Sequence, residues 1–107
     1  MKKQTEKKLE KRIILNLKMM GFYTYKTASH GGCYDYNLQF NEAGITDLIV
    51  IGGKNKVTFM EIKLPYKRNY KDGGLSEEQV DFRDLCKEKD VAWALVYSIK
   101  EALEAVR

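Results

Sequence analysis

Two acidic residues and a lysine, Asp47, Glu61 and Lys63, have types and a spacing that could do chemistry. Asp47 precedes an apolar run at 48–51, and Glu61 and Lys63 follow a second run at 57–60. The link between the runs contains Gly-Gly, which favours a β-hairpin. Alternate residues of a strand point to the same face, so Glu61 and Lys63 should share one. We therefore expect the three charged groups to meet at one end of a small sheet.

Two carboxylates beside apolar strands are costly to bury unless they are paired, solvated or bound to a cation. A divalent metal such as Mg²⁺ would resolve the conflict, with Asp47, Glu61 and the backbone carbonyl of Ile62 as oxygen ligands. Lys63 could then orient an attacking water, help to deprotonate it, or stabilise negative charge on a phosphate. The short pattern alone is explained equally well by a solvated pair, Glu61 and Lys63, at a strand end.

The composition is that of an ordinary globular protein. The chain has 107 residues, of which 44% are hydrophobic and 32% charged, so we expect a single domain over residues 1–107. No apolar run approaches the roughly 20 residues of a membrane span, and no signal-type core follows the Lys-rich start. The two cysteines, Cys33 and Cys86, form no CxxC pair and are expected to be free thiols. These features favour a cytoplasmic protein.

The net charge of +4 comes from basic residues that cluster in two regions. One cluster extends from the N-terminus to Lys26, and the other contains Lys67, Arg68 and Lys71. Basic surfaces of this kind suit a polyanion, so we expect these residues to bind nucleic acid. A solvated helix face and a basic loop would account for either cluster on its own.

The apolar periodicity predicts helices at 5–20, at about 77–89 and from 99 to the C-terminus, and strands at 22–27, 48–51, 57–60 and 91–97. The order α-β-β-β-α-β-α is that of an α/β protein with a mixed central sheet and helices on its faces. The strand at 91–97 is almost continuously apolar, as a buried strand would be, and its Trp93 is expected to anchor a core or an interface. The segment 66–74 is expected to be a basic loop.

Several side chains have two explanations from sequence. Glu6 could be an exposed first-turn acid favoured by the helix dipole, or could point inward at one end of the sheet. Gln79 completes a capping box with Ser76, but its amide could instead face the metal site. The aromatic residues of the irregular segment 28–43 are expected in core or interface packing, with base stacking as the alternative. The inward side of the helix at 77–89 is expected to consist of Val80, Phe82, Leu85 and Cys86.

Taken together, the motifs resemble the PD-(D/E)XK nuclease fold and, more narrowly, the VRR-NUC family. That family's pattern is E-x-x-x-Q in a first helix, Gly at its end, a strand ending in Lys, G-x-P-D, E-x-K, and S-x-x-Q at a helix start. The matching residues here are Glu6-x-x-x-Glu10, Gly21, Lys26, Gly44-Ile45-Thr46-Asp47, Glu61-Ile62-Lys63 and Ser76-x-x-Gln79. The match covers nearly the whole chain. Thr46 replaces the usual Pro, and Glu10 replaces Gln, where it could tune metal affinity or lie on the surface.

The resemblance implies phosphodiester hydrolysis that depends on Mg²⁺ or Mn²⁺. It implies that Asp47 and Glu61 hold the metal, that Glu6 is a further carboxylate on the metal or beside it, and that Lys63 positions the attacking water. Gln79 would orient this water or the scissile phosphate.

Short members of the family look like phage enzymes that dimerise and cleave branched DNA such as four-way (Holliday) junctions, which would place the protein in a host cytoplasm. Two symmetric cuts require two active sites, so a homodimer is expected. The alternatives are a restriction-type or general DNA nuclease, an RNA-directed nuclease, and a non-catalytic nucleic-acid-binding module.

Overall fold

The computed structural model describes residues 4–27 and 44–107, and the structural statements below concern these residues. In chain order the elements are α1 (Glu6–Met19), β1 (Tyr23–Lys26), β2 (Leu48–Ile51), β3 (Val57–Ile62), the 3₁₀ helices η2 (Pro65–Asn69) and η3 (Lys71–Gly74), α2 (Glu77–Glu88), β4 (Ala92–Val96) and α3 (Ile99–Val106). The predicted order of helices and strands is confirmed. The predictions made for 28–43, including those for Cys33, lie outside the described residues.

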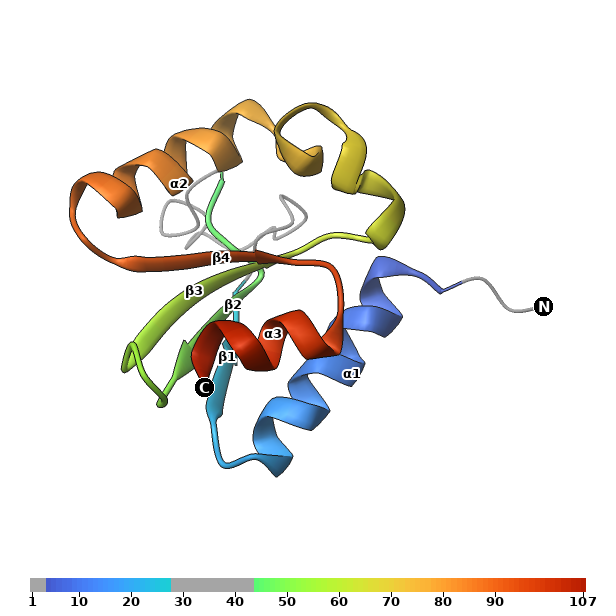
Figure 1. Ribbon diagram of the computed structural model, residues 1–107, viewed down its shortest axis with the longest axis vertical. Coiled ribbons are helices and arrows are strands. Elements are labelled where there is room, and N and C mark those ends of the chain that lie inside the picture. Colours follow the sequence, from blue (N-terminus) through green and yellow to red (C-terminus); the bar gives the residue numbers. More distant parts are fainter. Residues whose placement is uncertain (1–3, 28–43) are drawn as a thin grey trace, which may run out of the picture.

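The sheet has the strand order β1-β2-β3-β4. β1 and β2 pair antiparallel, as do β2 and β3, whereas β3 and β4 pair parallel, so the predicted mixed sheet is confirmed. Figure 1 shows α2 on one side of the sheet and α1 and α3 on the other. Gly52 and Gly53 take φ values of 120° and 76° between β2 and β3, a conformation that glycine adopts without steric cost.

The core lies between the sheet and the helices α1 and α3. Leu9, Ile13 and Leu17 form a buried stripe on α1, as their helical spacing predicts. Within β2, Leu48 and Val50 are buried whereas Ile51 is exposed, which follows from the two-residue period of a strand. Thr5 is the N-cap of α1, and its Oγ1 accepts a hydrogen bond from the Lys8 N–H at 3.1 Å.

Two predictions about burial are wrong. Strand β4 lies at the edge of the sheet, and four of its five residues, 92–95, are only half-buried. An apolar run therefore did not distinguish a central strand from an edge strand that has helices on both faces. Leu85 was expected on the inward side of α2 but is 47% exposed, whereas Cys86 is buried as a free thiol.

The segment predicted to be a basic loop, 66–74, instead lies within the two short helices η2 and η3. Arg68 fastens it to the start of α3, because its Nη2 lies 2.5 Å from Oε2 of Glu101 and its guanidinium lies 4.3 Å from the ring centroid of Tyr97. The Tyr97 hydroxyl donates a hydrogen bond to the Gly73 carbonyl at 2.7 Å. Within the described ranges, no helix is both long enough and apolar enough to cross a bilayer.

Candidate active site

Backbone hydrogen bonds fix Asp47 just ahead of β2. The Thr27 N–H donates to the Asp47 carbonyl at 3.0 Å, and the Thr27 hydroxyl donates to the Thr46 carbonyl. Thr46 is fully buried, and its own hydroxyl donates to the Leu48 carbonyl at 3.0 Å. Hydrogen bonds therefore hold this turn, at the position where a proline would restrict φ through its ring.

Asp47 and Glu61 form a buried carboxyl pair. They are 5% and 1% exposed, and Oδ2 of Asp47 accepts a hydrogen bond from the Ile62 N–H at 2.9 Å. Burial raises the pKa of Glu61 to about 10, and the neighbouring Asp47 adds to this effect, against the opposing charge of Lys63. The protein alone thus favours a proton on Glu61 beside Asp47.

The two oxygens of Glu61 have different surroundings. Oε2 lies 3.2 Å from the Gln79 amide nitrogen, which donates to it, and 3.9 Å from the Lys63 ammonium. Oε1 is buried and has no hydrogen-bond partner among the described residues. A buried acceptor without a partner is unfavourable, so a cation or a hydrogen-bond donor beside this oxygen would be stabilising.

These groups fit a hard divalent cation. Mg²⁺ in proteins is commonly held by one or two carboxylates, with water and substrate phosphate completing its coordination. Asp47 and Glu61 supply such a pair, and the carbonyl of Ile62 remains a predicted third ligand. Among residues 4–27 and 44–107, no group of three or more His, Cys, Asp or Glu side chains is suited to a metal.

Gln79 caps α2 and also contacts Glu61. Its Oε1 accepts from the Ser76 N–H at 2.9 Å, while its own N–H donates to the Ser76 hydroxyl at 3.2 Å, which completes the capping box. Its amide nitrogen is the one that contacts Glu61. Gly44 helps to place this turn, because it has φ +91° and a Cβ there would lie 2.1 Å from the Glu78 carbonyl oxygen.

Glu6 is half-buried and Glu10 is buried, and each is paired with a lysine. Oε2 of Glu6 lies 3.6 Å from the Lys67 ammonium, although the charge of Glu6 still helps to raise the pKa of Glu61. Glu10 was expected to tune the metal or lie on the surface; it is buried, and its Oε1 lies 3.1 Å from the Lys26 ammonium. The sequence did contain an indication of this burial, because Glu10 lies in the apolar stripe of α1, three residues before Ile13.

The predicted nucleic-acid-binding residues are therefore not all free cations. Lys26, Lys67 and Arg68 each form an ion pair with an acid of a helix, as described above, whereas Lys71 is exposed on η3. Lys26 keeps 47% of its side-chain surface exposed, so it can still face a phosphate. The basic surface is weaker than its sequence suggests, because acids of α1 and α3 neutralise part of it.

An antiparallel hairpin that carries Asp47, Glu61 and Lys63, a parallel fourth strand and a helix that presents Gln79 define the PD-(D/E)XK-like nuclease fold. The structure is similar to a solved structure described as a VRR_NUC domain, with a TM-score of 0.65 and 20% sequence identity over 92% of this chain and 90% of that one. The chain has the fold of a VRR-NUC domain, so the resemblance seen in its motifs is confirmed at the level of the fold. No family model matches the sequence, and no curated protein matches it.

Proposed function

We propose that this protein is a metal-dependent, structure-specific DNA endonuclease that cleaves branched DNA as a homodimer. The observation that carries the proposal is the unpartnered Oε1 of Glu61, buried beside Asp47, while Lys63 and Gln79 approach the other oxygen. A peripheral ion pair would not leave a buried acceptor in this state. The VRR-NUC fold supports the same reading.

Asp47 and Glu61 would hold Mg²⁺ or Mn²⁺ in this proposal. Such a cation, when bound, makes water a better nucleophile and neutralises charge on the phosphate. Lys63 lies within 3.9 Å of Glu61, so its ammonium can hold the attacking water or a phosphate oxygen beside the acidic pair. The Gln79 amide is fixed at both ends by hydrogen bonds, which allows it to orient the water or phosphate with little loss of side-chain entropy.

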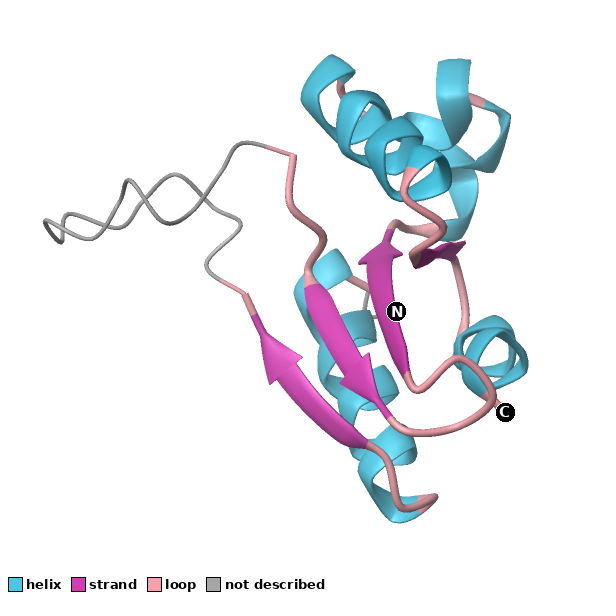
Figure 2. Cartoon of the chain, turned by 90° about the vertical axis from the view of Figure 1, so that its left-hand side faces the viewer, coloured by secondary structure: helices cyan, strands magenta, loops and turns pink. Residues whose placement is uncertain are grey.

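A twofold dimer would supply the two cuts that a junction requires, and an apolar row on the sheet supports this part of the proposal. Tyr23, Ile51 and Val57 lie opposite one another across three strands, and each is more than 40% exposed. Figure 2 shows α1 behind β1 and β2 and no described helix in front of them. Sedimentation of the protein and of an Ile51→Lys variant tests the pairing: the variant should sediment as a monomer, and an unchanged dimer would exclude this surface.

The test of function is a gel assay with Mg²⁺ or Mn²⁺ on a four-way junction and on linear duplexes of the same sequences. Paired symmetric nicks on the junction alone would support the proposal, whereas cutting of both substrates would remove junction specificity. Lys63→Ala should abolish cleavage, and Lys18→Ala, the same change at an exposed position of α1, should not. Binding without cleavage by the wild type would favour a non-catalytic nucleic-acid-binding module instead.

A further inference from the structure

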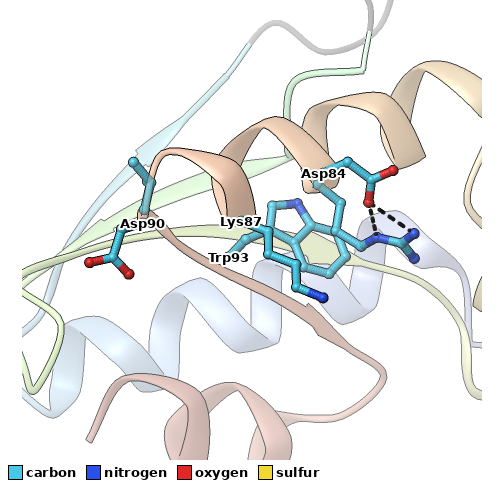
Figure 3. Close-up of a pocket in the computed structure, with 6 residues that line it drawn as sticks. Asp84, Lys87, Asp90 and Trp93 are labelled. Atoms are coloured by element: carbon cyan, nitrogen blue, oxygen red, sulfur yellow. Dashed lines mark hydrogen bonds and ion pairs between the residues drawn. The ribbon is translucent and has the colours of Figure 1, made fainter.

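A hollow of about 470 Å³ lies at the end of α2 that is remote from Gln79. Its lining comes from α2, from the turn that follows and from β4, and consists of Arg83, Asp84, Lys87, Asp90, Val91 and Trp93. Figure 3 shows the Trp93 ring beneath α2, between Asp84 and Asp90, with Lys87 beside it. The volume falls within the roughly 300–1,000 Å³ that small-ligand pockets occupy. None of these residues belongs to the catalytic set described above.

The Trp93 indole is on the same face of the sheet as Glu61. Trp93 is paired with Phe59 in the β3–β4 register, and Glu61 follows Phe59 by two residues. Phe59 packs edge-on against Phe82, with ring centroids 5.3 Å apart, and this contact holds α2 over that face. The indole Nε1–H is buried without a hydrogen-bond partner among the described residues, which is unusual for a tryptophan that serves only the core.

The charges around the hollow cancel. Arg83 and Lys87 contribute two cations, and Asp84 and Asp90 contribute two carboxylates. Asp84 also fixes Arg83, because its Oδ1 lies 3.1 Å from both Nε and Nη2 of the guanidinium. A lining without net charge does not favour a bare phosphate. It does offer hydrogen-bond donors and acceptors beside an aromatic ring, which are the groups that the edges and faces of a nucleobase require.

We propose that this hollow binds an unpaired nucleobase of the DNA substrate by stacking it on Trp93, with Arg83, Lys87 and the two aspartates around its edge. The inference rests on the proposed function, since it concerns the same DNA. Gln79 and Lys87 are eight residues apart on α2, about 12 Å along the helix axis. The base would therefore be held at a short distance from the cut, and unpaired bases are available where DNA branches or is single-stranded.

Trp93 is the only tryptophan in the sequence, so its fluorescence reports on the hollow directly. Metal-free protein is titrated with a single-stranded DNA oligonucleotide and with an abasic oligonucleotide of the same length, while sedimentation measures the binding of each. The base-carrying strand should quench the emission saturably, and the abasic strand should bind with little quenching. Equal quenching by both strands, or quenching by neither, would overturn the proposal.

A kinetic comparison separates this inference from the proposed function. Trp93→Leu should raise KM for a branched substrate about tenfold and leave kcat nearly unchanged, since loss of a stacked base weakens binding rather than chemistry. Trp93→Phe should recover most of the loss. Lys87→Ala should weaken binding, whereas Lys89→Ala, at the C-cap of the same helix and outside the lining, should not. Quenching without cleavage would refute the nuclease and leave the base site; cleavage by a wild type that shows no quenching would refute the base site alone.

Discussion

Glu61 and Glu101 are both partly or fully removed from water, but their surroundings act on them in opposite directions. Burial, then the nearby Asp47, raises the pKa of Glu61, and its Oε1 lacks a partner. Burial also opposes the charge of Glu101, but the Arg68 guanidinium and the Tyr97 N–H outweigh it, so the pKa of Glu101 lies below its usual value. The fully paired acid fastens η2 to α3, whereas the under-paired one is left able to accept a ligand. Glu101 therefore stabilises the fold, whereas Glu61 is retained at a cost in stability.

The largest effects should follow Glu61→Gln, with opposite signs for activity and stability. Metal-dependent cleavage should fall at least about a thousandfold, because an amide is a poor ligand for Mg²⁺. The metal-free protein should become more stable by about 1–3 kcal/mol at pH 8, because a group that resists ionisation in its buried position is replaced by a neutral one. Cleavage rates and urea unfolding measure the two changes. If the variant were both inactive and less stable, the idea that Glu61, unlike Glu101, lowers the stability of the fold would be wrong.

The resistance of Glu61 to ionisation should also make the stability of the protein depend on pH. Its folded pKa of about 10 exceeds the ordinary value of 4.5, so its contribution is fully present below pH 4.5 and is lost progressively as the pH rises. Between pH 6 and 8.5 the Tm of the metal-free protein should fall, and added Mg²⁺ should raise Tm more at the upper end, because a cation replaces the proton. Scanning calorimetry with and without Mg²⁺ checks this, and a Glu61→Gln protein with an unchanged slope would rule out Glu61 as its source.

Glu101→Gln should have the opposite effects to Glu61→Gln: it should lower stability and leave cleavage almost unchanged. Loss of the pair with Arg68 should destabilise the protein by about 0.5–1 kcal/mol at pH 7, as expected for a pair near the surface, with cleavage changed only slightly. Because the folded pKa is depressed, the Glu101 contribution is present above the ordinary value of 4.5 and lost as the pH falls through the folded pKa. Denaturant titrations should show a smaller stability deficit of the variant at pH 3 than at pH 7.

The smallest effect should come from Glu10→Gln, which restores the residue that the VRR-NUC pattern carries. The change removes the carboxylate that pairs with Lys26 and leaves that ammonium available to a phosphate. The slope of log K for DNA against log salt should steepen by up to about 0.9, the value for one more phosphate contact. Fluorescence anisotropy at several salt concentrations measures the slope, with Lys26→Met as the matched control. An identical slope in wild type and Glu10→Gln would show that loss of the Glu10 carboxylate adds no phosphate contact.

The parts of the site that sequence could predict are those fixed by short-range geometry. Asp47, Glu61 and Lys63 lie together because the strand period and a tight hairpin leave few other arrangements. Gln79 was placed at a helix start by its capping box, and the resemblance favoured an amide that faces the predicted metal site; its hydrogen bond to Glu61 was not predicted. Their catalytic roles stay predictions until cleavage is measured.

The parts that sequence did not predict depend on long-range pairing. Arg68 was predicted to bind DNA because of its local charge. Its partner Glu101 lies 33 residues further along the chain, and the two meet only once β4 and α3 are in place. The edge position of β4 likewise depends on strand order, which an apolar run does not encode. The two short helices of 65–74 take shape against α1 and α3, through Lys67 and Arg68, rather than from propensity.

The Gln79 amide links the first turn of α2 to Glu61, so activity should be more sensitive to heat than the fold as a whole. One end holds the Ser76 N–H at the start of α2, and the other holds Glu61. Fraying of that first turn would release Glu61 while the rest of the sheet stays folded, since helix ends open at lower free energy than cores. Activity should therefore decline on heating before the global transition, together with faster exchange of the Ser76 amide proton.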